Sequence, residues 1–471
     1  MTKGYHKLDG VEWPVGNQTP QERKSMARKV TRARKQTDKK LAGYTAALKA
    51  GNKTEARKIA DQYMKSYSGR LVAVVDQNRR RRRDQRYTLT KCHKFAVGIK
   101  AHKPCDEKVW VSLKPKKSGG KRVIQNFGLR RRSAQRMVRT ILQLRVSPQE
   151  WQFTLKGVQN AIRIVKKYDP SPDTWVARLD ITDFYGSFTC GGLNVSLWDI
   201  PKSIVKNTLL GEGSNIHYYH MYGYPMESHT KAARQGVPQG SVVSPLIGAL
   251  AVSKIAWEPD DGVVLINYVD DFLILAPSKE KLDKAIFALD SAITQELPGG
   301  NFHLKHEHLG TFSEGVDFLG HNFSFVTEKS VVDKKYVFEE KFVIIPTPSV
   351  FKRLGDNVDI MSDKIKVAKK LFVKEGSVKH RDSFVSRLAE LYAHLRGWKE
   401  SFGECDPVLI DGVVKDVHLE IGELLHGTNV TSDQVIAASS FKKGWMHYSE
   451  TSDQIELDLK HEDYGDDDDL V

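Results

Sequence analysis

The chain has 471 residues, 40% of them hydrophobic, and its 73 Lys and Arg against 58 Asp and Glu give a net charge of +15. This length and content can supply the cores of two to four subdomains. Residues 1–16 lack the apolar region of a signal peptide, and no uninterrupted apolar stretch approaches about 18 residues, so we expect no membrane span.

The positive charge is concentrated near the N-terminus. Residues 1–150 hold 39 Lys and Arg against 11 Asp and Glu, residues 151–400 hold 30 of each, and residues 401–471 hold 4 against 17. A strongly basic segment beside a neutral one predicts contacts with nucleic-acid phosphates. A solvated charged face is the alternative interpretation.

The first predicted element, residues 21–65, is rich in Ala, Lys, Arg and Gln and predicts two or three basic helices that could clamp RNA. A dense arginine series follows it. The predicted nucleic-acid-binding residues are Arg79, Arg80, Arg81, Arg82, Arg83, Arg86, Arg130, Arg131 and Arg132. Further along, Val109 to Ile124 predicts a strand hairpin, and Ser133 to Leu144 predicts a helix.

Two acidic sites end predicted buried strands. Trp175 to Leu179 runs directly into Asp180, and the apolar runs on either side of Tyr268 to Asp271 predict a hairpin with Asp270 and Asp271 at its tip. Adjacent carboxylates repel each other and are costly to bury without cations. If the strands pair, the three carboxylates meet and hold two Mg²⁺ roughly 3.5 to 4 Å apart, with Mn²⁺ as an alternative. Taken alone, an Asp-Asp pair is more often a turn former.

A loop between the two acidic sites favours the metal interpretation. Gln235 to Pro245 contains Gly236 and Gly240, which allow a close approach of backbone to a ligand, and Pro238, which stiffens the loop. Ser244-Pro245 then begins a small-residue apolar helix from Leu246 to Ile255.

By these ordered motifs the chain resembles a reverse transcriptase. Asp180 to Tyr185 resembles the first palm motif, Gln235 to Pro245 the template and nucleotide loop, and Tyr268 to Asp271 the second catalytic motif. Phe318, Leu319 and Gly320 are similar to the primer grip, Leu388 to Trp398 to part of a thumb, and Lys114 to Arg122 to the fingers hairpin.

The resemblance implies a set of site residues. Asp180 and Asp270 would bind both metals with the Ile181 carbonyl, Asp271 would support them, and Tyr185 would exclude a 2′-hydroxyl, with a packed palm aromatic as the alternative for Tyr185. Arg122 would bind the triphosphate, with Lys114 and Lys121 as weaker candidates, and Gln239 and Gly240 would contact the nucleotide and template. Lys305 or His308 could donate a proton to pyrophosphate, but neither is assigned.

The resemblance also implies an α+β right-hand polymerase fold with fingers, palm and thumb. We expect a basic helical extension at 1–70, fingers at 71–175, a palm at 176–345, a helical thumb at 346–405 and an acidic extension with a disordered tail at 406–471. In the thumb, Phe384, Leu388, Leu391, Leu395 and Trp398 form one predicted core stripe.

The expected function is RNA-directed synthesis of cDNA from deoxynucleotides on a structured non-coding RNA. No nuclease block follows Asp406, which favours a stand-alone bacterial enzyme of the abortive-infection or unknown-group families linked to antiphage defence. Template-independent or protein-primed synthesis, a retron enzyme and a maturase-like RNA-binding protein are the alternatives. The four scattered cysteines indicate free thiols and a cytoplasmic protein, and homo-oligomerisation stays open.

Overall fold

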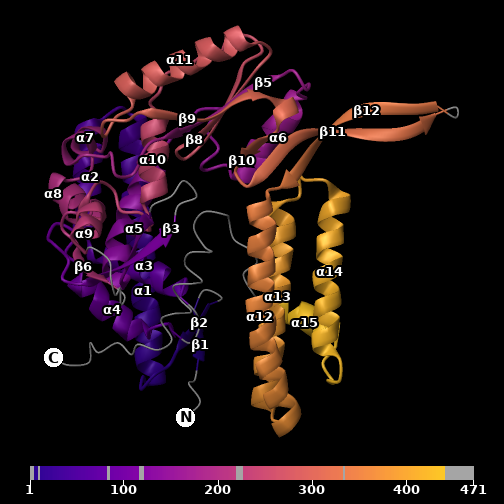
Figure 1. Cartoon of the computed structure of the whole chain (residues 1–471). Coiled ribbons are helices and arrows are strands. Elements are labelled where there is room, and N and C mark those ends of the chain that lie inside the picture. The colour runs from indigo at the N-terminus through magenta and orange to yellow at the C-terminus, as the bar shows by residue number, and fades with distance from the viewer. Residues whose placement is uncertain are drawn as a thin grey trace. The chain divides into compact units, whose positions relative to one another are not determined.

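The computed structural model describes residues 5–8, 11–81, 85–115, 121–218, 226–332 and 335–440 (Figure 1). Its mixture of helices and strands confirms the predicted α+β class. The chain divides into two compact units, one formed by 1–155, 180–258 and 287–305, the other by 156–179, 259–286 and 306–471. The five-part division into subdomains stays a prediction.

The first unit begins with a small hairpin and a group of helices. Its elements up to residue 155 are β1 (Tyr5–Leu8), β2 (Val11–Pro14), α1 (Pro20–Lys49), α2 (Lys53–Lys65), α3 (Tyr67–Arg79), α4 (Leu89–Gly98), β3 (Lys108–Pro115), β4 (Lys121–Phe127) and α5 (Leu129–Gln143). After residue 180 come α7 (Cys190–Ser196), α8 (Lys202–Ile204), a π-helical turn (Val205–Leu209), β6 (Asn215–Tyr218), α9 (Met226–Arg234) and α10 (Ser244–Val252).

Local signals set the ends of the N-terminal helices. Thr19 and Glu22 form a reciprocal capping box at the start of α1, with Pro20 in the first turn. The Asn52 and Ser66 side chains accept hydrogen bonds from the backbone N–H groups at the starts of α2 and α3. The predicted basic helices are therefore confirmed, with α1 continuous over 30 residues.

The predicted strand hairpin at Val109 to Ile124 is confirmed as β3 and β4, which pair antiparallel from Val109↔Phe127 to Pro115↔Lys121. β6 adds to β3 in parallel, giving the order β4-β3-β6. β6, which lies between Asp180 and the loop from Gln235 to Pro245 in the sequence, therefore extends this sheet. The predicted helix at Ser133 to Leu144 is α5, which begins four residues earlier.

A four-stranded sheet carries the acidic segments. Its order is β7 (Val264–Tyr268), β8 (Asp271–Ala276), β5 (Trp175–Ile181) and β9 (Leu304–Thr311). Phe272 to Ala276 are completely buried, which explains why β8 reads as a continuous apolar run. The helices α6 (Val158–Tyr168) and α11 (Lys279–Glu296) flank these strands in the sequence.

The second unit ends in a ribbon and a helical bundle (Figure 1). The strands β10 (Val316–Phe318), β11 (His321–Val332) and β12 (Lys335–Pro346) form an antiparallel sheet, from which β11 and β12 project as a long ribbon. The helices α12 (Pro348–Glu375), α13 (Val378–Ser401), α14 (Pro407–Leu425) and α15 (Ser432–Ser439) follow. The predicted core stripe on α13 is confirmed, since its five side chains are at most 2% exposed.

Candidate active site

A tight hairpin carries the second acidic motif. Tyr268 pairs with Asp271, so Val269 and Asp270 form a two-residue turn, and Val269 has a φ of +60°. A β-branched residue at positive φ is strained and needs support from its surroundings. The completely buried Asn267 supplies it, donating from Nδ2 to the carbonyls of Val269 (3.0 Å) and Asp271 (3.2 Å).

Asp271 has an arginine partner on the neighbouring strand. The Nη2 atom of Arg178 in β5 lies 3.1 Å from the Asp271 Oδ1 atom, and its Nη1 donates to the Asp317 carbonyl at 3.3 Å. This pair fixes the start of β8 beside β5. The sequence did not identify Arg178 or Asn267, although a polar Asn inside an apolar strand was a usable signal for the second.

Asp180 lies near the end of β5, the direct neighbour of β8 in the sheet. Carboxylate and carbonyl oxygens are the donors that Mg²⁺ prefers, so the residue types at Asp180, Ile181 and Asp270 fit that ion. Across the described part of the chain, no group of three or more His, Cys, Asp or Glu side chains is placed to hold a metal. The three-carboxylate site therefore stays a prediction.

The loop from Gln235 to Pro245 approaches the first palm motif and β4 through backbone contacts. The Val237 N–H donates to the Tyr185 carbonyl at 2.9 Å, and the Gln125 N–H in β4 donates to the Gln239 carbonyl at 2.8 Å. Gly240 has a φ of +100°, and a Cβ there would lie 2.3 Å from the Gln125 oxygen. The close approach at this glycine is made to the β4 backbone, and its predicted contact with a ligand stays a prediction.

Two predicted nucleotide contacts are Tyr185, beside this loop, and Gln239, within it. Tyr185 is half-buried beside Phe184, with ring centroids 5.4 Å apart. The Gln239 side chain is also half-buried, and its Oε1 is enclosed with no protein hydrogen-bond partner. An enclosed acceptor without a partner costs free energy, which a donor from a ligand would recover.

The hairpin of β3 and β4 presents like charges directly opposite one another. Lys114 on β3 pairs in register with the exposed Arg122 on β4, and Lys121 pairs with Pro115. Residues 116–120 at the turn, including Lys116 and Lys117, lie outside the described residues.

A model of a known protein family matches the segment that carries both acidic motifs and the loop between them. Residues 114–323 match the family model described as reverse transcriptase (RNA-dependent DNA polymerase). The chain contains a reverse transcriptase domain. Reverse transcriptase is the class of enzyme that the ordered motifs of the sequence predicted.

Solved structures give a weaker likeness. A telomerase from Candida albicans in complex with a fragment of telomeric RNA is 13% identical with a TM-score of 0.34, covering 75% of this chain and 62% of that one. An apo telomerase from Candida tropicalis is 16% identical with a TM-score of 0.27, covering 56% and 62%. The chain thus spans about three fifths of these telomerase chains. The sequence matches no curated protein.

The matched domain contains the arginines at 130–132, and the structure gives them contacts within the protein. Arg131 is 2% exposed and donates to the carbonyls of Asn207 and, at 3.0 Å, of Leu210, while burial lowers its pKa to about 10. Arg130 pairs with Asp106 at 2.9 Å, and Arg132 donates to Asn126 at 2.5 Å. The burial of Arg131 argues against its predicted contact with nucleic acid.

The arginines upstream of the domain differ in whether they face solvent or contact other parts of the protein. Arg79 and Arg80 are exposed at the end of α3, as the prediction requires. The Arg81 guanidinium lies 4.6 Å from the centre of the Tyr87 ring, and Arg86 donates to the carbonyls of Arg81 and Glu12. Arg82 and Arg83 lie outside the described residues.

The predicted primer grip of the domain is a tight turn between β10 and β11. Phe318 pairs with His321, and Leu319 and Gly320 both have positive φ, at +49° and +80°, as in the turns that suit hairpins. Phe318 is 1% exposed. Upstream on β9, Lys305 and His308 stand three residues apart and so point to opposite faces of the strand, which means that only one of them can face the chemistry.

His321 makes the stability of this turn pH-dependent. Its ring is 1% exposed, its Nδ1 lies 3.0 Å from the Leu319 carbonyl, and burial lowers its pKa to about 4. The unfolded chain therefore binds the proton first as the pH falls. The contribution of neutral His321 to stability is complete above about pH 6.5 and is lost between pH 6.5 and 4, amounting to roughly 3 kcal/mol.

We expect the unfolding free energy of His321→Gln to fall less from pH 7 to pH 4.5 than that of the natural protein. Urea unfolding at the two pH values measures both. His303→Gln, at an exposed position, serves as the control and should follow the natural protein. Equal losses in all three proteins would contradict the role of His321.

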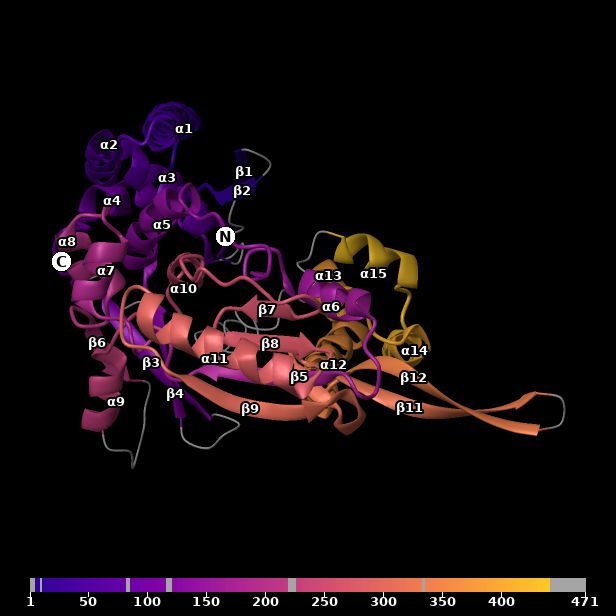
Figure 2. The same cartoon turned by 90° about the horizontal axis from the view of Figure 1, so that it is seen from above.

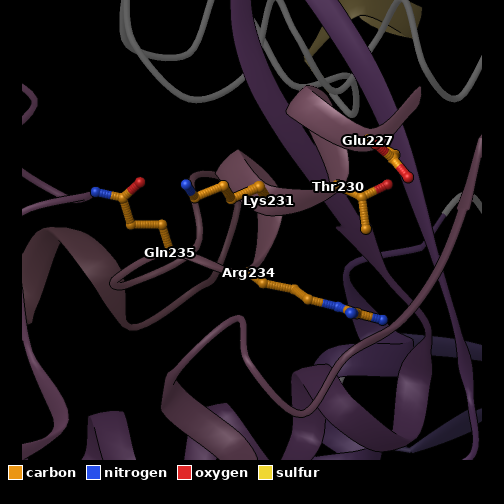
Figure 3. Close-up of a pocket in the computed structure, with 5 residues that line it drawn as sticks. All are labelled: Glu227, Thr230, Lys231, Arg234 and Gln235. Atoms are coloured by element: carbon orange, nitrogen blue, oxygen red, sulfur yellow. The ribbon is translucent and has the colours of Figure 1, made fainter. Parts of the chain in front are cut away.

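An open pocket adjoins the nucleotide loop (Figure 3). It is lined by Glu227, Thr230, Lys231, Arg234 and Gln235. The first four lie on α9, which is held to β4 by the Gln125 side chain donating to the Ala233 carbonyl at 2.6 Å. In Figure 3 the Lys231 and Arg234 side chains extend in different directions, so the pocket has two separate cationic positions.

Among the described residues, no helix combines the length and the apolar composition that crossing a bilayer requires.

Proposed function

We propose that the protein synthesises cDNA on an RNA template by metal-dependent nucleotidyl transfer. The observation that carries this proposal is the family match at residues 114–323, which spans both acidic sites and the loop between them. The backbone contacts that tie this loop to Tyr185 and to β4 support it, because they bring the first palm motif and the fingers hairpin to one loop.

In this proposal Asp180 and Asp270, with the Ile181 carbonyl, hold two Mg²⁺. When bound there, Mg²⁺ would supply a lower pKa for the attacking hydroxyl and charge neutralisation for the leaving oxygens. Asp271 supports the site from its ion pair with Arg178, which orients the turn that carries Asp270. Asn267 keeps the same turn in its strained conformation.

The nucleotide side of the site consists of cations and an unpaired acceptor. Arg122 binds the triphosphate, since its planar fork matches phosphate oxygens, and Lys114 and Lys121 add charge nearby. Gln239 and Gly240 contact the nucleotide and template. The enclosed Oε1 of Gln239 and the exposed position of Arg122 support these roles.

Tyr185 sets the choice of sugar in this proposal. We expect Tyr185→Ala to raise incorporation of ribonucleotides relative to deoxynucleotides about tenfold or more, because removing the ring opens space for a 2′-hydroxyl. Tyr185→Phe keeps the ring and is the matched control, so its sugar discrimination should equal that of the natural protein. Competition between labelled ATP and dATP measures the ratio. Unchanged discrimination in the Ala variant would mean that the ring only packs against Phe184.

We further propose that the template is a dedicated structured RNA and that the enzyme serves antiphage defence in bacteria. The excess of 28 positive charges in residues 1–150 supports the RNA partner. The defence role rests on the resemblance to stand-alone enzymes. Sequencing of RNA that copurifies with the protein tests the partner, and plaque counts on cells carrying the natural protein or its Asp270→Asn variant test the role.

A single incorporation experiment separates the proposal from its alternatives. Purified protein is incubated with labelled deoxynucleotides, with and without its copurified RNA. An RNA-dependent product that nucleases degrade supports templated synthesis. Label that migrates with the protein indicates protein priming, and no label indicates a maturase-like RNA-binding protein; either result would overturn the proposal.

A further inference from the structure

The long helix α1 carries a stripe of exposed cations that lies outside the matched domain. The stripe consists of Lys24, Arg28, Arg32, Lys35 and Lys39, all exposed. At about 100° per residue these five positions fall within an arc of about 80°, and at about 1.5 Å per residue they span about 22 Å along the axis. We call them the α1 stripe.

The stripe faces away from the core that holds α1 in place. The buried residues of this helix are Met26, Val30, Ala33, Thr37, Tyr44 and Ala47, which centre on the opposite side of the helical wheel. That face packs on α2 and α3, and in Figure 2 α1 lies at the edge of this helical group. The stripe is therefore an outer surface of the first unit.

The charge pattern is costly without an anionic partner. Lys24, Arg28 and Arg32 follow one another at a spacing of four, as do Lys35 and Lys39, and like charges at this spacing destabilise a helix. A helix exposed only to solvent usually alternates its charges. Here α1 has ten Lys and Arg against two acids. Glu22 is engaged in the capping box, and Asp38 is the one acid beside the five cations of the stripe.

The surroundings of the stripe identify the kind of partner. A membrane-surface helix needs an exposed apolar face, but the apolar face of α1 is buried. Binding to single-stranded bases usually uses exposed aromatic rings, and the only aromatic residue of α1, Tyr44, is completely buried. The stripe itself is a straight line of cations, which suits the phosphates of a duplex.

We infer that the α1 stripe binds the phosphate backbone of a nucleic-acid duplex independently of sequence. The inference deepens the proposed function, on which it rests for the choice of structured RNA as the partner. The stripe holds double-stranded parts of that RNA, outside the reverse transcriptase domain.

The test compares two variants that lose the same charge. The stripe variant changes Lys24, Arg28, Arg32, Lys35 and Lys39 to Gln. The control variant changes five other exposed cations, at the end of α1 and on α2, to Gln. They are Lys49, Lys53, Arg57, Lys58 and Lys65. Fluorescence anisotropy measures binding of a labelled RNA hairpin of arbitrary sequence at several NaCl concentrations, in EDTA and without nucleotides, so the result does not depend on catalysis.

We expect the stripe variant to bind the hairpin at least tenfold more weakly at 150 mM NaCl, and the slope of log K against log salt to fall by about 2 to 4. The control variant should change affinity less than threefold. The unfolding temperature of the stripe variant should equal or exceed that of the natural protein, because the repulsion among the five cations has been removed.

Equal losses in the two variants would overturn the inference, because net charge alone would then explain binding. It would also be overturned if the stripe variant lost as much affinity for a single-stranded oligo(U) of the same length as for the hairpin. The same holds if the stripe variant lost affinity only for vesicles of anionic lipid and not for RNA. A failure of the proposed function would appear separately, as absent deoxynucleotide incorporation by the natural protein.

Discussion

The double variant Asp270→Asn with Asp271→Asn is expected to lose deoxynucleotide incorporation by at least about 10³-fold. Its amides keep the shape of both side chains but remove the two negative charges proposed to hold and support Mg²⁺. Charge stabilisation by bound metal is worth several kcal/mol in such displacements, and each 1.36 kcal/mol corresponds to a factor of ten in rate. Incorporation is measured with labelled deoxynucleotides on the copurified RNA.

Asp260 and Asp261 provide a matched control, because they are an exposed Asp-Asp pair shortly upstream in the same unit. Asp260→Asn with Asp261→Asn makes the same change in charge and should keep incorporation within about twofold. Both double variants should bind the RNA hairpin as the natural protein does. Full activity in the Asp270 and Asp271 variant would rule out the proposed site.

The acidic hairpin shows how far the sequence could go. The apolar runs on either side of Tyr268 to Asp271 predicted two strands with Asp270 and Asp271 at the tip. The structure has the turn at Val269 and Asp270, and β8 already begins at Asp271. The ion pair of Asp271 with Arg178 could not be predicted, because it depends on which strand lies beside β8. Strand order is set by packing across the whole sheet and leaves little trace in a single strand.

The arginines at 130–132 show a different limit. Their density correctly indicates a basic segment, but density does not distinguish a side chain that faces solvent from one that binds carbonyls inside the protein. Arg131 is in the second group. The stripe on α1 was accessible to prediction, since helical spacing alone places its five cations on one face, whereas the burial of the opposite face needed the structure.

The loop at Gly240 leads to the second large effect. Its φ of +100° lies in a region that side chains rarely adopt, and an added Cβ would meet the Gln125 carbonyl of β4 at 2.3 Å. Both partners of that contact are backbone, so neither a rotamer change nor a small side-chain movement can relieve it. The adjacent hydrogen bond from Gln125 to the Gln239 carbonyl would have to lengthen.

We therefore expect Gly240→Ala to reduce incorporation about 100-fold or more and to lower the unfolding free energy by about 1 to 3 kcal/mol, the cost of such backbone strain. The loss of activity follows because Gln239 shifts away from the fingers hairpin that carries Arg122. Gly213→Ala is the control, since its Cβ would meet other atoms at 3.8 Å or more, an ordinary contact. It should retain incorporation within about twofold. If Gly240→Ala incorporated deoxynucleotides as well as Gly213→Ala, the close approach of loop and strand would have no part in positioning the nucleotide.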